Sequence, residues 1–101
     1  MRIISQEKIQ SAINKKEVIA AVMAGFINHA KGQSIIPEPM QFLFKNKDSE
    51  LMGDCHVKGA QSSCEDMFVV KIASGFYNNA QVGLPTNNGM VLLFSTFTGQ
   101  P

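Results

Sequence analysis

Two lysines stand in apolar surroundings where a charged side chain is uncommon. Lys71 lies within Phe68–Ala73, a near-continuous apolar run typical of a strand that is covered on both faces. An ammonium group in such a strand is costly to desolvate unless an anion meets it. Lys58, directly before Gly59 in an expected partner strand, poses the same problem more weakly. The chemistry that these two residues suggest is the binding of a small anionic ligand.

The register of the expected hairpin decides whether the two lysines act together. Side chains alternate between the faces of a strand, so both lysines project from one face if residue 58 pairs with residue 67 or 71. A register shifted by one residue places them on opposite faces, and the sequence leaves both arrangements open. A purely structural alternative for Lys71 is a side chain whose stem covers apolar surface while its ammonium group reaches water.

The remaining reactive side chains give weaker signals. Cys55 and Cys64 are too few for a disulfide framework, so we expect two reduced thiols. A metal site built from these cysteines with His56 and Asp66 matches no zinc spacing. Cys55 and His56 are neighbours in a strand and point to opposite faces, which excludes a nucleophile and base pair. His29, near the end of an expected helix, is expected to lie on the surface.

Composition limits the class of protein. A chain of 101 residues forms one domain, and its net charge of +1 without a basic block gives no electrostatic footprint for nucleic acid. Hydrophobic residues make up 45% and charged residues 17%, which favours a buried interface and predicts a homo-oligomer, most simply a dimer. No apolar run approaches the length of a membrane span and no signal peptide is visible, so the chain is expected to be cytoplasmic.

Helical periodicity is confined to the first third of the chain. Ser5 is placed to cap a short helix over Gln6–Ile13. Residues 14–17 interrupt this pattern and open a longer helix that ends near Lys31, with Gly32 as its C-terminal cap. Together the two helices are expected to act as scaffold for the strands that follow.

Strand signals fill the rest of the chain. Ile3 and Ile4 suggest a short edge strand, and a long loop is expected over Gly75–Asn88. The main strands are predicted at Met40–Phe44, Leu51–Lys58, Met67–Ser74 and Met90–Phe94. We therefore predict an α+β fold for residues 1–101, with the N-terminal helix pair packed on a mostly antiparallel sheet and no Rossmann domain. The turn signal at 98–99 lacks a following strand, so the sheet edge is a candidate to accept one from a partner subunit.

Several segments, taken in order, resemble the ornithine cyclodeaminase/mu-crystallin family. They are GDCHVKG (53–59), FVVKIASGFYNN (68–79), VGLP (82–85) and GMVLLF (89–94) with the following Thr98-Gly99. The combination is specific, whereas any one segment alone is weak. The resemblance extends over essentially the whole chain.

Members of that family are longer enzymes with an N-terminal substrate-binding and dimerisation domain followed by an NAD(P)-binding Rossmann domain. They include ornithine cyclodeaminase, archaeal alanine dehydrogenase and ketimine reductases, which transfer a hydride at a carbon bearing an amino or imino group. The resemblance implies that Lys71 is catalytic and reaches the substrate at the reaction centre. It also implies that Lys58 binds the substrate carboxylate and that His56 of the same motif contributes to substrate binding.

This sequence departs from the family pattern in one segment. Many members carry an arginine after the proline of the segment matching Ile36–Met40, where it clamps the carboxylate, but Glu38, Pro39 and Met40 stand here. The Rossmann domain and the catalytic aspartate of the family have no counterpart within these residues. We therefore expect the substrate-binding and dimerisation half of such an enzyme, inactive alone, with NAD(P) implied only for a full-length relative.

Two alternatives remain open at this stage. The first is a stand-alone, non-catalytic dimeric module that binds a small amino acid, keto acid or other anion. The second is a structural relic that keeps only the fold. No cofactor-binding or metal-ligating residue is assigned under any of these interpretations.

Overall fold

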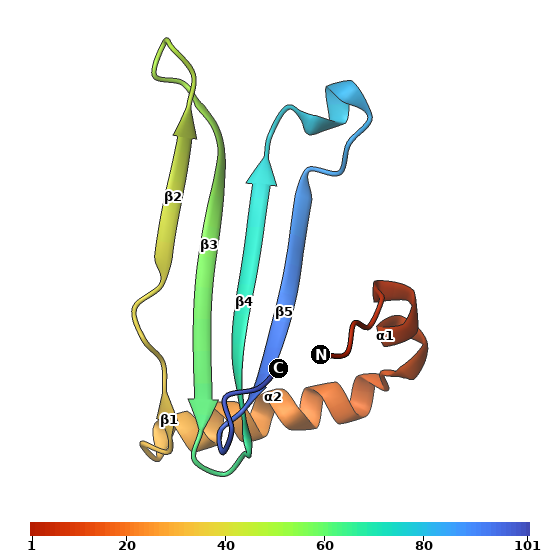
Figure 1. Ribbon diagram of the computed structural model, residues 1–101, viewed down its shortest axis with the longest axis vertical. Coiled ribbons are helices and arrows are strands. Elements are labelled where there is room, and N and C mark those ends of the chain that lie inside the picture. Colours follow the sequence, from red (N-terminus) through yellow and green to blue (C-terminus); the bar gives the residue numbers. More distant parts are fainter.

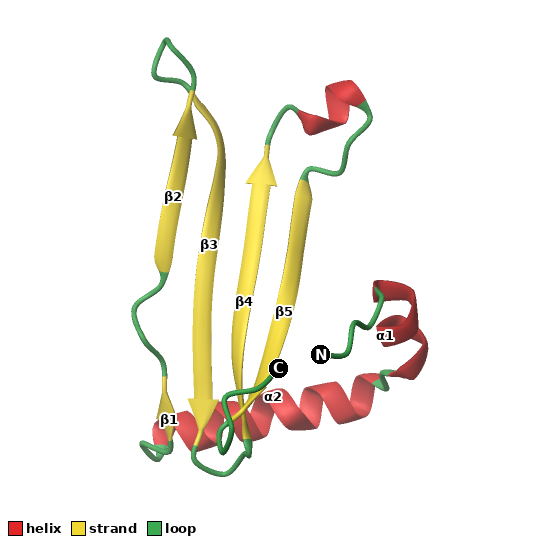
Figure 2. Ribbon diagram, in the orientation of Figure 1, coloured by secondary structure: helices red, strands yellow, loops and turns green.

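The computed structural model describes all 101 residues as two helices beside a 5-stranded antiparallel sheet (Figure 1). The helices are α1 (Gln6–Ala12) and α2 (Lys15–Ala30), and a short 3-10 helix η1 spans Asn79–Val82. The strands are β1 (Ser34–Ile35), β2 (Met40–Lys45), β3 (Leu51–Ser62), β4 (Met67–Phe76) and β5 (Asn87–Ser95). The predicted α+β class is confirmed, with helices at the N-terminus and an antiparallel sheet after them (Figure 2).

Side-chain caps set the beginnings of both helices. The Ser5 hydroxyl accepts a hydrogen bond from the Lys8 backbone N–H at 3.3 Å, as the sequence predicted. Asn14 starts α2 in the same way, because its Oδ1 accepts from the N–H of Lys16 at 2.9 Å. The chain leaves α2 at Gly32 with φ 72°, a left-handed conformation that glycine adopts without steric cost.

The centre of the sheet is the long hairpin of β3 and β4. The edge of β3 that faces away from β4 pairs with two short strands. β2 pairs with the first half of β3, and β1 pairs with the C-terminal end of β3. β5 pairs with the outer edge of β4. The hairpin register places Lys58 directly opposite Lys71 and His56 opposite Ala73. The structure therefore resolves the register that the sequence left open, and both lysines project from one face.

All four predicted main strands are shorter than the strands observed, although β2 exceeds its prediction by Lys45 alone. β3 and β4 continue to pair with each other as far as Gln61 and Phe76, and β3 reaches Ser62 because that residue pairs with Ser34 on β1. β5 begins at Asn87 rather than Met90. The sequence did not predict these first residues as strand, because asparagine and glycine have low strand propensity. There the partners in β4 are small residues, Gly75 among them. The prediction of an edge strand at Ile3 and Ile4 is wrong, since this segment has no strand partner.

Gly53 marks a point where three strands approach closely. Its pairing partners are Phe44 on β2 and Phe76 on β4, whose rings stack with centroids 5.3 Å apart. A Cβ atom at position 53 would lie 2.5 Å from the Gly75 carbonyl oxygen and 2.7 Å from the Phe76 ring. Only glycine allows this approach, and Gly53 and Gly75 are the two buried residues of the chain.

Most of the apolar surface is left without cover. α2 lies across one end of the sheet and contacts β1 and β3 (Figure 1), while Phe26 on this helix is 73% exposed. The accessible surface is 8475 Å², compared with about 5,600 Å² for a compact protein of this mass. The radius of gyration is 16.6 Å, compared with about 13 Å for a compact chain of this length. The fold is thus extended, and its apolar faces are exposed.

The C-terminal turn closes on itself after β5. Gln100 accepts a hydrogen bond through its carbonyl from the Ser95 N–H at 2.9 Å, and Thr96 N–H donates to the Asp66 carbonyl at 2.9 Å. These bonds tie the turn to the β3–β4 loop, but the outer edge of β5 has no partner strand. Neither helix is both long enough and apolar enough to cross a bilayer.

Candidate functional site

Lys58 and Lys71 form a directly opposed pair in the middle of the sheet. Neither ammonium group forms an ion pair, because the contact between His56 and Asp54 is the one salt bridge of the chain. Like charges that lie opposite each other on neighbouring strands destabilise a sheet. An anion bound between these ammonium groups would relieve that repulsion.

The expectation that Lys71 is buried is not met in this chain. Both lysines are exposed, because no helix of the chain packs extensively on β4, where Lys71 lies. The desolvation cost inferred from the apolar run Phe68–Ala73 is therefore absent here. What distinguishes the lysines is their mutual repulsion together with their lack of an acidic partner.

An open pocket of about 370 Å³ lies over this face of β3 and β4. Its lining contains the three residues that the sequence placed in the site, namely His56, Lys58 and Lys71. The other lining residues are Asp54, Ala73, Ser74, Gly75, Tyr77, Asn87 and Asn88. The pocket thus combines two fixed positive charges, one carboxylate, one imidazole and several neutral polar groups.

Asp54 was not identified from the sequence, although a signal for it existed. Residues 54, 56 and 58 alternate along β3, so their side chains share one face. The same period-two pattern that relates His56 to Lys58 therefore extends to the carboxylate. No sequence pattern predicted that Tyr77 and Asn87 would line the pocket. They come together through the path of residues 77–86 between β4 and β5, which no periodic pattern encodes.

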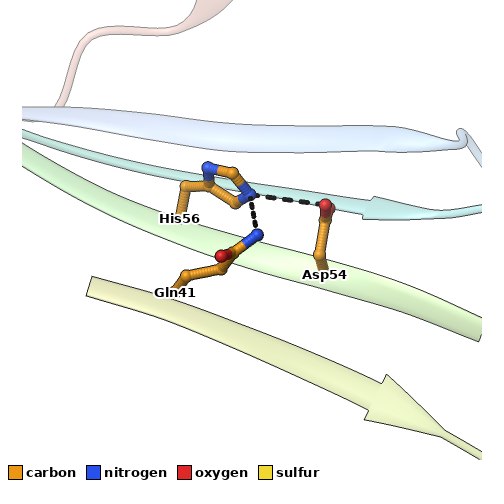
Figure 3. A network of polar contacts seen from close by, with 3 residues as sticks. All are labelled: Gln41, Asp54 and His56. Atoms are coloured by element: carbon orange, nitrogen blue, oxygen red, sulfur yellow. Dashed lines mark hydrogen bonds and ion pairs between the residues drawn. The ribbon is translucent and has the colours of Figure 1, made fainter. Parts of the chain in front are cut away.

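His56 lies at the centre of a polar network that joins two strands (Figure 3). Its Nε2 atom is 3.2 Å from Nε2 of Gln41 on β2 and 3.3 Å from Oδ2 of Asp54. The register pairs Gln41 with His56 directly, which explains the cross-strand contact. The side chains of His56 and Asp54 are 36% and 28% exposed, so the network is only partly shielded from water.

The other reactive residues lie away from this pocket. Cys55 pairs with Phe42 and Ser74 on the opposite face from His56, as strand alternation predicted. Both cysteines are free thiols, and Sγ of Cys64 donates to Oε1 of Gln33 at 3.8 Å. No group of three or more His, Cys, Asp or Glu side chains is arranged to hold a metal ion.

His29 is exposed, as predicted, and is held by one contact near the end of α2. Its Nδ1 atom lies 2.6 Å from the Ser34 hydroxyl on β1. The two histidines of the chain therefore have different ring partners, a hydroxyl for His29 and an amide with a carboxylate for His56.

Fold and site together define a small α+β domain with a cationic pocket on one face of an antiparallel sheet. The chain belongs to the ornithine cyclodeaminase/mu-crystallin family, whose model matches residues 1–101. The resemblance seen in the sequence motifs is thereby confirmed.

Two curated relatives come from rhizobia. The chain is 30% identical over 100 residues to a provisionally named dehydrogenase, RB0419, of Rhizobium meliloti (strain 1021), which covers 98% of this chain and 29% of the relative. It is 43% identical over 47 residues to the uncharacterized cyclodeaminase y4tK of Sinorhizobium fredii (strain NBRC 101917 / NGR234), covering 46% of this chain and 14% of the relative. The chain thus spans less than a third of the length of either protein.

Two solved structures share the fold. An archaeal alanine dehydrogenase dimer with bound NAD superposes with a TM-score of 0.84 at 27% identity, over 95% of this chain and 28% of that chain. The Δ1-pyrroline-2-carboxylate reductase of Thermococcus litoralis, in complex with NADH and L-proline, also gives a TM-score of 0.84, at 24% identity. That match covers 100% of this chain and 30% of the reductase. The fold described here therefore corresponds to one part of larger enzymes.

The residues of this chain do not fit a dinucleotide. A Rossmann fold binds its cofactor at the carboxyl ends of parallel strands, beside a glycine-rich turn that opens a helix. Every strand pair here is antiparallel, and no helix of this kind follows a strand. Any nicotinamide cofactor of a full-length form must therefore be held by other residues.

Proposed function

We propose that this chain is the substrate-binding and dimerisation part of an NAD(P)-dependent enzyme that acts on an amino or imino acid. The observation that carries the proposal is the opposed pair Lys58 and Lys71, unpaired on the floor of a pocket. Two ammonium groups from neighbouring strands attract the carboxylate of a ligand, to which Lys58 donates while Lys71 reaches the rest of the molecule. Membership of the family supports an amino or imino acid as the source of that carboxylate.

The roles proposed for the three site residues come from the resemblance to the family, and their positions on one face of the sheet support them. Lys58 on β3 binds the carboxylate, and Lys71 on β4 reaches the reacting end of the ligand and is the catalytic residue. His56 lies two residues from Lys58 on the same face and contacts the ligand from the side of β2. A nicotinamide cofactor, when bound elsewhere in the full-length enzyme, supplies or accepts the hydride. The residues of this chain bind and orient the substrate, so the chain alone is expected to be inactive.

Dimerisation is the second part of the proposal. The face opposite the lysines carries an apolar surface of side chains from four strands, which we call the apolar face. It comprises Met40, Phe42, Phe44, Val57, Phe68, Val70, Ile72, Phe76, Met90, Leu92 and Phe94. The surplus accessible surface of about 2,900 Å² exceeds the roughly 800 Å² that each partner buries in a standard interface. The neighbouring alanine dehydrogenase is described as a dimer, which supports the same arrangement here.

The test is carboxylate binding by variants of the lysine pair. We expect alanine, proline or pyruvate to raise the melting temperature of the wild-type protein, because a ligand that binds only the folded state stabilises it. Lys71→Met and Lys58→Met should lose this shift, whereas Lys45→Met, at the end of β2 and outside the pocket, should keep it. Unchanged affinity in both pocket variants would contradict the proposed site.

The same titration separates the two other interpretations. A stand-alone binding module predicts that the ligand shift persists while hydride transfer is absent from the native full-length product. A structural relic predicts that no amino or keto acid shifts the melting temperature of the wild-type protein. Neither alternative is favoured by a specific contact in the structure.

A further inference from the structure

Asp54 contributes an acidic side chain to a pocket that otherwise concentrates positive charge. It lies four positions before Lys58, about 13 Å along an extended strand, so it does not neutralise the lysine pair. Its Oδ2 atom instead lies 3.3 Å from Nε2 of His56. The carboxylate therefore acts on the imidazole and leaves both ammonium groups without a partner.

The two contacts of Nε2 of His56, with Asp54 and with the Gln41 amide nitrogen, favour different tautomers of the imidazole. If Nε2 carries hydrogen, it donates to the Asp54 carboxylate, and Gln41 must turn its amide oxygen toward the ring. If Nε2 carries a lone pair, it accepts from the Gln41 amide, but that lone pair then faces a carboxylate at 3.3 Å. A hydrogen bond to a charged acceptor is roughly twice as strong as one between neutral groups. The Asp54 carboxylate therefore determines the tautomer of His56, and the Gln41 side chain turns its amide oxygen toward the Nε2 hydrogen.

We infer that Asp54 is a positioning residue that fixes neutral His56 with hydrogen on Nε2, so that Nδ1 presents a hydrogen-bond acceptor to the ligand. Nδ1 of His56 has no protein partner, and Figure 3 shows this second ring nitrogen on the side of the ring away from both contacts. His56 lines the same pocket as Lys58 and Lys71. The tautomer of His56 does not depend on the proposed function. Only the identity of the ligand group that contacts Nδ1 rests on the proposed function.

The consequence is selection for a ligand with an N–H group. An amino acid bound through its carboxylate offers an N–H donor to Nδ1, whereas the 2-oxo acid of the same carbon skeleton offers only an acceptor. Two acceptors facing each other leave a polar group without a partner, which costs affinity. Asp54 thus makes the site prefer an amino acid over its oxo acid without touching either ligand.

The first experiment measures the tautomer in the ligand-free protein. Nitrogen-15 labelling of histidine and long-range proton–nitrogen correlation distinguish hydrogen on Nε2 from hydrogen on Nδ1, at about pH 8, where an ordinary imidazole is neutral. We expect His56 to carry hydrogen on Nε2 in the wild type and to shift toward Nδ1 in Asp54→Ala. His56→Gln assigns the signals, and His29, bound to Ser34, is an internal reference that must not change. Hydrogen on Nδ1 in the wild type, or an unchanged tautomer in the variant, would overturn the positioning role.

The second experiment compares alanine with pyruvate by calorimetry on the same proteins. The wild type should bind alanine about threefold to tenfold more tightly than pyruvate, the effect of one net hydrogen bond. In Asp54→Ala this ratio should fall to one or below, because hydrogen on Nδ1 donates to the oxo group of pyruvate and no longer accepts from the amino group of alanine. Asp48→Ala, which removes an acidic side chain from the turn between β2 and β3, should leave the ratio as in the wild type.

The outcomes separate this inference from the proposed function. Equal binding of both acids by the wild type would overturn the selectivity and leave the lysine site intact. Failure of both acids to bind would overturn the site and the selectivity together. An equal loss of affinity for both acids in Asp54→Ala would show a general effect on pocket shape and would also overturn the inference. If Asp54→Ala fails to fold, Asp54→Asn removes the charge at the same size and should shift the tautomer in the same direction.

Discussion

Lys58 on β3 lies directly opposite Lys71 on β4, and neither ammonium group has an acidic partner anywhere in the chain. Such a pair costs stability in the free protein, since like charges opposed across two strands repel each other. In the proposed function, an anion bound in the pocket above them would offset this cost. Stability without ligand and affinity for ligand should therefore change in opposite directions when one lysine is replaced.

The first prediction concerns the repulsion between Lys58 and Lys71. Lys71→Met should raise the free energy of unfolding without ligand by about 0.2 to 1 kcal/mol, because it removes the cross-strand repulsion. The same variant should show no further stabilisation by alanine or pyruvate. Urea unfolding with and without ligand measures both effects, and the gain without ligand should shrink as salt screens the charges. A variant that is less stable than the wild type at low salt would contradict this account of the pair.

The second prediction concerns Gly53. Gly53→Ala should destabilise the protein by about 2 kcal/mol or more, because the added Cβ meets the Gly75 carbonyl oxygen at 2.5 Å and the Phe76 ring at 2.7 Å. The strands must separate to admit the methyl group, which also disturbs the stacked rings of Phe44 and Phe76. Thermal unfolding of the variant provides the measurement.

The matched control for Gly53 lies in α2. Gly25 has nothing within 4 Å of the position that a Cβ would take, and it lies within the helix. Gly25→Ala should therefore stabilise the protein, by about 0.5 to 1 kcal/mol from helix propensity alone. Equal and negligible effects of the two substitutions would show that the close approach at Gly53 does not limit stability.

The third prediction concerns the apolar face. Met90, which is 58% exposed on that face, should contact the partner subunit in the proposed dimer. Met90→Lys should shift the protein toward monomer in light scattering, because the interface would have to bury an unpaired charge. Leu93→Lys places the same charge on the opposite face of β5 and should leave the mass unchanged. A monodisperse monomer for the wild type would refute the interface altogether.

The fourth prediction concerns pH and the start of α1. A hydrogen bond from its own backbone N–H and one from the Ser5 hydroxyl lower the pKa of the Glu7 carboxyl from its ordinary value of 4.5. A lowered folded-state pKa means that the contribution of Glu7 to stability is present above pH 4.5 and is lost as the pH falls through the lower value. Ser5→Ala should raise the pKa of Glu7 part of the way back, measured by carbon-13 titration. Ser11→Ala, at the other end of the helix, should leave it unchanged.

The sequence by itself determined the local elements and part of the site. Ser5 and Gly32 set helix ends through interactions within a few residues, and these predictions hold within one residue. The class of the fold followed from the order of helical and strand periodicity. The anomaly of a lysine within Phe68–Ala73 drew attention to a strand that lines the pocket, because a charge in an apolar run conflicts with its neighbours regardless of the fold.

Only the tertiary structure decided how the strands align and what they bring together. The register that opposes Lys58 and Lys71 depends on backbone pairing along the whole hairpin, and the sequence leaves more than one register open. Gln41 reaches His56 from a strand 15 residues away, a contact that no local pattern encodes. The exposure of Lys71 likewise depends on which elements cover the sheet, a property of packing between distant segments. Local propensities act within a few residues, whereas register and cover arise from contacts between segments far apart in the chain.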